Sequence, residues 1–236
     1  MARLEFKNAL IVGAGVGLSA SLARLFAKQS WAVSLAARTP GGLEELCDET
    51  GAKAYACDAS SESDVAGLFN QLDDDGRTPD LVVYNPSARQ RAPFLELDAE
   101  LVKNAILVTA YGGFLVAQEA ATRMVPNGSG AILFTGASAS VKGYPMSAPF
   151  AMGKFALRGL AQSMARELAP RGIHVAHFVI DGGIRNPNRP GRVDAKSNPD
   201  TMLDPDVIAE TYLQIAMQDK SAWTWEVELR PWVENF

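Results

Sequence analysis

A glycine-rich turn near the start of the chain has the composition of a phosphate-binding loop. Gly13, Gly15, Val16 and Gly17 directly follow the apolar run Ala9–Val12 and precede an alanine-rich stretch with helical spacing. Glycines let a backbone turn tightly and approach a pyrophosphate, and the free amides and the dipole at a helix start favour its negative charge. The segment predicts a dinucleotide site; a tight turn without a ligand is the alternative.

A second segment places Lys154 four residues after Phe150. In a helix this spacing puts both side chains on one face, one turn apart. A buried ammonium without a partner is costly, so Lys154 requires either water or a ligand if it is buried. Phe150 has no ionisable proton and cannot act as an acid or base. The alternatives are core packing for Phe150 and an exposed surface position for Lys154.

The second apolar run ends at Ala37 and Arg38. No acidic residue is present there to bond the ribose hydroxyls of NAD, whereas a planar and permanently charged guanidinium suits the 2′-phosphate of NADP. The sequence therefore predicts NADP(H) in preference to NAD(H), with a solvated surface arginine as the alternative.

Apolar runs and helical stretches alternate along the chain. Such alternation is typical of crossover units and a parallel sheet, so we expect a single α/β domain over residues 1–236, a Rossmann-type, doubly wound sheet of about seven strands flanked by helices. The expected strands are Ala9–Val12, Ala32–Ala36, Ala54–Cys57, Leu81–Tyr84, Ala131–Thr135, His174–Ile180 and Glu226–Leu229. The expected helices are Ser19–Gln29, Gly42–Glu49, Ser61–Leu72, Ala99–Met124 and Ala148–Ala169.

Together these segments resemble the short-chain dehydrogenase/reductase family, which joins the turn Thr-Gly-x-x-x-Gly-x-Gly to Tyr-x-x-x-Lys. Gly13 and Gly17 match the turn, whereas Val12 replaces its Thr and Ser19 its last Gly. The tyrosine position holds Phe150, which indicates an atypical subgroup. The resemblance covers nearly the whole chain and implies an NAD(P)-binding fold.

The resemblance also implies roles for individual side chains in the reaction. Lys154 matches the lysine that binds the nicotinamide ribose, Phe150 replaces the acid/base tyrosine, and Thr109 stands at the position of an asparagine that supports a proton-relay water. The family's usual spacing for the serine that orients the carbonyl falls on Ala137, and Ser138 is one residue closer, so we assign Ser138.

Further positions carry over to the cofactor and to the substrate loop. Asp58 falls where the family has an aspartate near the adenine ring, and Asn85 is retained from Asn-Asn-Ala-Gly. Gly182 and Ile184 follow the sixth strand, where the family often has Pro-Gly. The irregular stretch 181–205 is then expected to cover the nicotinamide end as a lid that orders on binding.

Replacement proton donors can be named, although each is more often structural than catalytic. They are Tyr111, Ser140, Tyr144 and Ser147. His174 and His177 occupy one strand at a spacing that puts them on opposite faces, so we interpret both as structural.

Composition limits the partners and the compartment. The net charge is −5 and no basic run is present, which argues against nucleic acid. No signal-peptide or membrane segment is evident, and the two cysteines lack metal-ligand spacing, so we expect a cytoplasmic protein without a metal site. The family resemblance implies that the aromatic tail 221–236 forms a homodimer or homotetramer contact, and aromatic residues with Arg are favoured at interfaces; closure of the core is the alternative.

Two functions remain open. The first is an NADP(H)-dependent oxidoreductase that reduces an apolar carbonyl or activated alkene, with protonation by another side chain or by water. The second is a cofactor-binding protein without hydride chemistry, such as a redox sensor or an assembly partner. The second follows from the Phe150 and Thr109 replacements, because a proton donor such as the missing tyrosine contributes about 10²- to 10⁴-fold in rate. That loss does not exclude hydride transfer itself, and we favour the first function.

Overall fold

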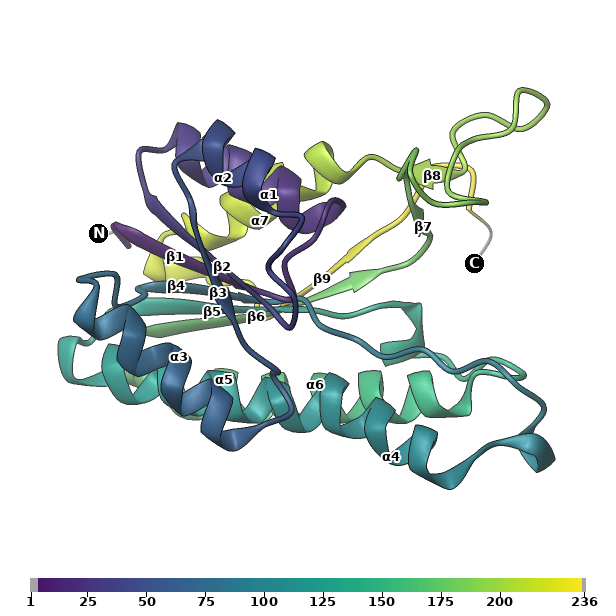
Figure 1. Cartoon of the computed structure of the whole chain (residues 1–236), viewed down its shortest axis with the longest axis horizontal. Coiled ribbons are helices and arrows are strands. Elements are labelled where there is room, and N and C mark those ends of the chain that lie inside the picture. Colours follow the sequence, from purple (N-terminus) through teal and green to yellow (C-terminus); the bar gives the residue numbers. More distant parts are fainter. Residues whose placement is uncertain (1–3, 235–236) are drawn as a thin grey trace.

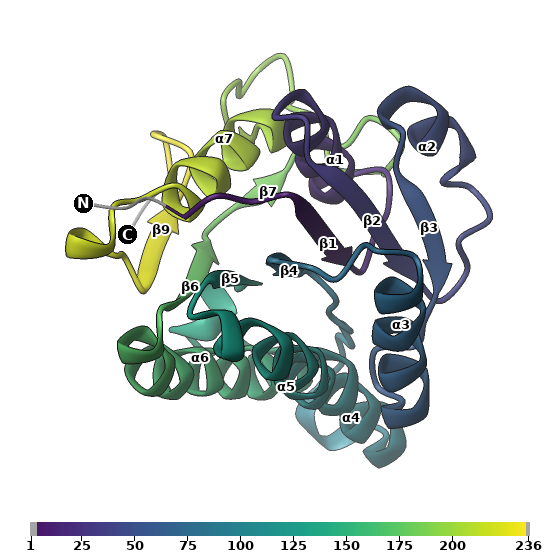
Figure 2. The same ribbon diagram turned by 90° about the vertical axis from the view of Figure 1, so that its left-hand side faces the viewer.

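The computed structural model of the chain describes residues 4–234. A seven-stranded parallel sheet lies between two layers of helices, with strand order β3-β2-β1-β4-β5-β6-β9. Helices α1, α2 and α7 cover one face, and α3, α4, α5 and α6 lie on the other (Figures 1 and 2). The predicted doubly wound α/β fold is confirmed.

The elements of the sheet and its flanking helices are short and regular. The strands are β1 Asn8–Val12, β2 Ala32–Ala37, β3 Lys53–Ala56, β4 Leu81–Tyr84, β5 Gly130–Thr135, β6 Ile173–Ile180 and β9 Glu226–Leu229, and a separate parallel pair is β7 Gly183–Ile184 with β8 Met202–Leu203. The helices are α1 Leu18–Lys28, α2 Glu44–Thr50, α3 Glu62–Asp74, α4 Ala99–Ile106, α5 Gly112–Met124, α6 Ala148–Leu168 and α7 Pro205–Ala216. Single 3₁₀ turns span Phe94–Glu96, Val125–Asn127, Ser138–Ser140, Ala169–Arg171 and Lys220–Ala222.

The core explains why the strands are readable from sequence. Every residue of β4, β5 and β6 is buried, as expected for parallel strands covered on both faces. Alternate side chains of each strand enter two apolar clusters, one beneath α1 and α7 and one beneath α3, α5 and α6. All seven predicted strands are present, with ends within one residue of the prediction.

The predicted helix Ala99–Met124 is divided by a π-helical segment, Leu107–Tyr111, between α4 and α5. The stretch 99–127 is also long and apolar enough to cross a membrane by length and composition alone. Part of this apolar character faces the sheet, since Val116 and Ala120 are fully buried in the core. Leu101 and Phe114 are exposed.

The stretch 181–205 is more ordered than an irregular lid. It contains β7 and β8, which pair in parallel. The Asp194 carboxylate accepts hydrogen bonds from the Thr201 and Met202 amides at 2.8 and 2.9 Å, and Arg185 forms ion pairs with Asp194 and Asp204. The base of the loop is thus fixed by hydrogen bonds and ion pairs. Asp204 also caps α7, and this helix was not predicted from the sequence.

The aromatic tail packs partly against its own chain. Trp223 stacks on His174 with ring centroids 4.7 Å apart and lies against the core, whereas Trp232 is 82% exposed. Trp223 therefore helps to close the core, which was the alternative to an interface role for the tail. Residues 235–236 of the predicted tail, and residues 1–3 of the predicted domain, lie outside the described residues.

Candidate functional site

A cleft of about 1100 Å³ opens at the carboxyl ends of the strands. Two loops extend beyond these ends, residues 85–98 below and residues 181–203 above in the view of Figure 1. Residues from the glycine turn, from the ends of β2, β4 and β6, from the start of α6 and from both loops line it. This is where open parallel sheets bind ligands, at the point where the strand order reverses beside β1.

The glycine turn has the backbone that a bound phosphate group requires. Gly13 has φ +79°, and a Cβ there would lie 2.7 Å from the Pro86 nitrogen, so only glycine fits. A Cβ on Gly15 would meet no atom within 4 Å, which leaves this backbone open to the cleft. Helix α1 begins after Gly17 with neither a side-chain cap nor an acidic residue in its first turn. Its amides are therefore available to an anion such as a pyrophosphate.

Ser19 provides a connection that a glycine could not make. Its hydroxyl donates to the Gly13 carbonyl at 3.0 Å and accepts from the Asn85 side chain at 2.8 Å. Asn85 itself lies at the end of β4 and lines the cleft. The departure from the family's last glycine therefore ties the turn to the central strand, and Asn85 supports the turn through Ser19.

Arg38 and Asp58 flank the cleft beside the first crossover. Arg38 is exposed, lines the cleft and has no carboxylate partner within ion-pair distance in the part of the chain that the structure describes. The Asp58 carboxylate accepts hydrogen bonds from the Ser60 amide and hydroxyl at 2.9 and 2.6 Å, and these bonds lower its pKa. A free guanidinium at the end of β2, with Ala37 before it, fits a 2′-phosphate.

Lys154 is buried, contrary to the alternative of a surface position. It is 2% exposed, and its Nζ donates to the Thr135 carbonyl at 2.5 Å. Burial, with a smaller effect from the Arg89 charge, lowers the pKa of Lys154 to about 7. The Nζ lies 6.0 Å from the centre of the Phe150 ring, so the predicted pair does share one face of α6. Both residues line the cleft.

Arg89 was not predicted and contacts the altered position directly. Its guanidinium lies 4.5 Å from the centre of the Phe150 ring, on the loop that follows β4. A planar guanidinium stacks well on an aromatic face and keeps its edge N–H groups free. No periodic pattern in the sequence joins residue 89 to residue 150. The contact depends on the path of the loop.

The other predicted catalytic residues are divided between the cleft and the core. Ser138 and Ala137 both line the cleft, as do Tyr144 and Ser147. Thr109 is fully buried and is not among the residues that line it. The Thr109 hydroxyl instead accepts a hydrogen bond from the Ala88 amide at 3.2 Å, which places it behind the loop that carries Arg89. Tyr111 also lies outside the cleft lining.

A buried polar chain supports the Ser138 turn from behind. Arg158 forms two hydrogen bonds with Glu226, which in turn contacts His177 Nδ1 at 3.1 Å. His177 Nε2 lies 3.3 Å from the Ser140 hydroxyl, which accepts from the Ala137 amide. Ser140 is fully buried, so this serine, histidine and carboxylate cannot attack a substrate. Burial lowers the pKa of His177 to about 4 and keeps it neutral.

The start of the upper loop is held beside the cleft. Gly182 has φ +153°, and a Cβ there would lie 2.9 Å from the Pro231 ring. Asp181 is buried and forms an ion pair with Lys142 at 3.4 Å. Gly182 and Ile184 both line the cleft, where the family resemblance places them.

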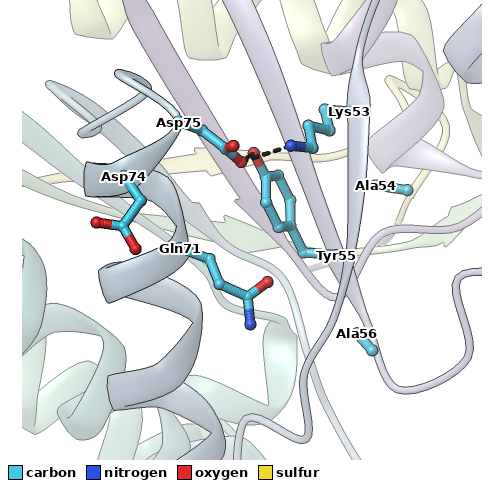
Figure 3. A pocket seen from close by; sticks show the side chains of 7 residues that line it. All are labelled: Lys53, Ala54, Tyr55, Ala56, Gln71, Asp74 and Asp75. Atoms are coloured by element: carbon cyan, nitrogen blue, oxygen red, sulfur yellow. Dashed lines mark hydrogen bonds and ion pairs between the residues drawn. The ribbon is translucent and has the colours of Figure 1, made fainter.

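A second hollow, at the outer edge of β3, has three of its polar side chains joined to one another. Figure 3 shows Asp75 accepting from Lys53 at 2.6 Å and from the Tyr55 hydroxyl at 2.7 Å. Gln71 and Asp74 complete its wall from α3. No cluster of three or more metal-ligating side chains occurs among residues 4–234.

Residues 7–189 match the family model described as short chain dehydrogenase. The chain belongs to the short chain dehydrogenase family.

Relatives of known structure or name agree with that assignment. A solved short-chain dehydrogenase from Rhodopseudomonas palustris is 33% identical, with a TM-score of 0.81 over 96% of this chain and 99% of that one. Short chain aldehyde dehydrogenase 1 of Euphorbia lathyris is 31% identical over 73% of this chain, and the match spans 62% of that relative's length, less than two thirds. The cyclic-di-GMP-binding biofilm dispersal mediator protein of Escherichia coli is 29% identical over 82% of this chain and 76% of its own.

Proposed function

We propose that the protein is an NADP(H)-dependent oxidoreductase that reduces a carbonyl or activated alkene without a catalytic tyrosine. The observation that carries this proposal is that Lys154 is buried and lines the same cleft as the open glycine turn. A buried lysine whose pKa burial lowers to about 7 is stabilised in its charged form by an anionic or hydroxyl-rich ligand. The Thr135 carbonyl alone satisfies one of its three donors.

The residues of the cleft fit the whole dinucleotide. Arg38 would bind the 2′-phosphate, the amides at the start of α1 would bind the pyrophosphate, and Lys154 would bind the nicotinamide ribose. NADPH, when bound, supplies the hydride. Ser138, partly exposed in the cleft, would orient the accepting group by hydrogen bonding.

Protonation requires a group other than Phe150. Tyr144 and Ser147 line the cleft, whereas Ser140 and Tyr111 do not. Tyr144 is 44% exposed, so water reaches the same space. We propose that solvent water would supply the proton to the carbonyl oxygen and leave hydroxide, so that carbonyl, NADPH and water would give alcohol, NADP⁺ and hydroxide. Turnover should then be slower than with a positioned phenol.

The test of this proposal is calorimetric titration with NADPH and NADH, followed by a screen of carbonyls and enones for NADPH consumption. The wild-type protein should bind NADPH more tightly than NADH. Arg38→Gln should weaken NADPH binding by about 10- to 100-fold and leave NADH binding unchanged, because only NADPH carries the 2′-phosphate. Tight NADPH binding with no product in the whole screen would contradict the reductase.

A second candidate is a cofactor-binding protein without hydride chemistry. Phe150 at the usual tyrosine position supports it, and so does the relative from Escherichia coli that is named for binding cyclic-di-GMP. On this hypothesis the dinucleotide serves as a signal of redox state. Stoichiometric consumption of NADPH with any carbonyl would remove it.

We also propose a cytoplasmic homodimer or homotetramer. Exposed apolar side chains lie on neighbouring helices, Leu101 on α4, Phe114 on α5, and Met152 and Phe155 on α6. The two cysteines are unpaired, which is usual in a reducing compartment. Analytical ultracentrifugation gives the mass, and a monomer at micromolar concentration would contradict the oligomer.

A further inference from the structure

Positive charge is concentrated in the cleft although the chain as a whole is acidic. The chain has a net charge of −5, yet more cationic than anionic side chains line the cleft. The cationic residues are Arg38, Arg89, Arg91, Lys154, Arg185, Arg189 and Arg192, and the carboxylates are Asp58, Asp181 and Glu234. A cleft of one sign focuses the field on ligands of the other sign.

Only some of these cationic side chains are explained by contacts with a dinucleotide or by ion pairs within the loop 181–203. Arg38 suits the 2′-phosphate, and Lys154 suits the ribose. Arg189 belongs to the loop segment that lies above the glycine turn, where the Asn186 side chain comes within 3.6 Å of a Cβ placed on Gly17. Arg185 is paired with carboxylates of its own loop.

Arg89, Arg91 and Arg192, here called the arginine cluster, remain. Arg89 and Arg91 follow β4, whereas Arg192 lies on the opposite loop between β7 and β8. No ion pair joins any of the three to a carboxylate among residues 4–234. Although Arg89 is exposed overall, partial desolvation lowers its pKa most, and the charges of Arg192 and then Arg91 lower it further, with no acidic side chain acting in the other direction. Like charges held together in this way favour binding of an anion.

Arg192 shares the backbone-bonded loop segment of Asn186 and Arg189, but its guanidinium, like that of Arg89, has its nearest described neighbours away from the glycine turn. Arg89 stacks on Phe150, and Phe150 shares a helix face with Lys154 at the nicotinamide end. The Nη1 atom of Arg192 lies 2.7 Å from where a Cβ on Gly183 would stand, so the glycine makes room for this guanidinium beside the start of the upper loop. The stacked face of Arg89 leaves its edge N–H groups free for an oxyanion.

We propose that the arginine cluster binds a carboxylate or phosphate group of the substrate, which makes the substrate an anionic oxo compound. This inference rests on the proposed function and replaces the expectation of an apolar substrate. The two loops hold the anion from opposite sides, and the stack on Phe150 brings it next to the reacting group. Phe150 then has a role that a catalytic tyrosine lacks, because its ring holds Arg89 where the guanidinium can bind the substrate anion.

The experiment compares an oxo acid with its neutral ester on the NADPH-loaded protein. The probes are 4-oxopentanoate, its methyl ester and inorganic phosphate, and binding is followed by calorimetry and nicotinamide fluorescence. The variants are Arg89→Gln, Arg89→Lys and Arg192→Gln. Arg171→Gln is the matched control, since Arg171 is exposed on the turn that precedes β6, at the other end of the sheet.

The wild-type and Arg171→Gln proteins should bind the acid about 10- to 100-fold more tightly than the ester, with phosphate competing. Arg89→Gln and Arg192→Gln should bring the two affinities to within about threefold while NADPH affinity is kept, and Arg89→Lys should retain part of the preference. Equal binding of acid and ester by the wild type, or no anion binding at all, would overturn the inference. A loss of NADPH affinity in Arg89→Gln without loss of the acid preference would also overturn it. Failure of the wild type to bind NADPH would instead overturn the proposed function.

Discussion

Phe150→Tyr places a phenol where the family has its proton donor, and it should raise the rate of NADPH-dependent carbonyl reduction. The Arg89 guanidinium is 4.5 Å from the ring centre, and at an effective dielectric constant of about 20 a charge at that distance contributes about 3 to 4 kcal/mol to a phenolate before screening. Because Arg89 is exposed, solvent and salt screen its charge and reduce this stabilisation of the phenolate to about 1 kcal/mol. The pKa of the new phenol should then lie below its ordinary value, and Lys154 acts in the same direction where it is charged.

We expect the rate of reduction to rise by about 10²- to 10⁴-fold, the usual contribution of a general acid. The rate should fall as the pH rises through the pKa of the phenol, because only the protonated phenol can donate. Steady-state NADPH oxidation with one carbonyl substrate, measured from pH 6 to 10, is the assay. Phe150→Leu is the matched control, because it removes the ring without adding an acid.

No gain in Phe150→Tyr, with NADPH affinity and thermal midpoint unchanged, would refute the assignment of this position. An equal gain in Phe150→Leu would show that space rather than a proton donor limits the reaction, and would refute it as well.

Three further substitutions test the structure around the cleft. Gly13→Ala should weaken NADPH binding and cost about 1 to 3 kcal/mol in unfolding free energy, because φ is +79° and the new Cβ would meet Pro86; Gly143→Ala, in open space, should unfold as the wild type does. Lys154→Met should keep or raise the thermal midpoint, since burial of the ammonium opposes folding, while the reduction rate falls at least tenfold. The pKa of His177 is about 4 in the folded protein and higher in the unfolded chain, so unfolding free energy should fall from about pH 6.5 to 4 by up to about 1.4 kcal/mol per pH unit; His177→Gln should reduce that slope in urea titrations at each pH.

The strands were predictable because parallel strands buried on both faces are predominantly apolar, as in Leu81–Tyr84, and the two histidines of Ile173–Ile180 do not interrupt that pattern. Helix α7 was not predicted, although its start carries two sequence signals: Asp204 as the N-cap and Pro205 at the first helical position. Both residues lie at the end of the stretch that was expected to be irregular. The pair β7 and β8 is only two residues long in each strand, too short for any periodic pattern.

Glycine content and side-chain charge within short segments singled out the glycine turn, Arg38 and Lys154, and the structure places all three at the cleft. Arg89 beside Phe150 and Glu226 beside His177 could not be found in this way. Each pair joins distant segments, and only the three-dimensional path of the loops and strands brings them together. Thr109 was assigned by its position in the family motif, yet its buried hydroxyl faces Ala88.

Hydride transfer in a cleft whose tyrosine position holds Phe150 can be followed by the transfer of deuterium from cofactor to product. The protein is incubated with an oxo acid and with NADPH that carries deuterium at both C4 positions, and the product is examined by mass spectrometry. One deuterium should appear on the former carbonyl carbon in step with the formation of NADP⁺, and this labelled product should be lost in Lys154→Met. Tight NADPH binding with no labelled product would contradict hydride transfer and would leave the dinucleotide as a bound signal.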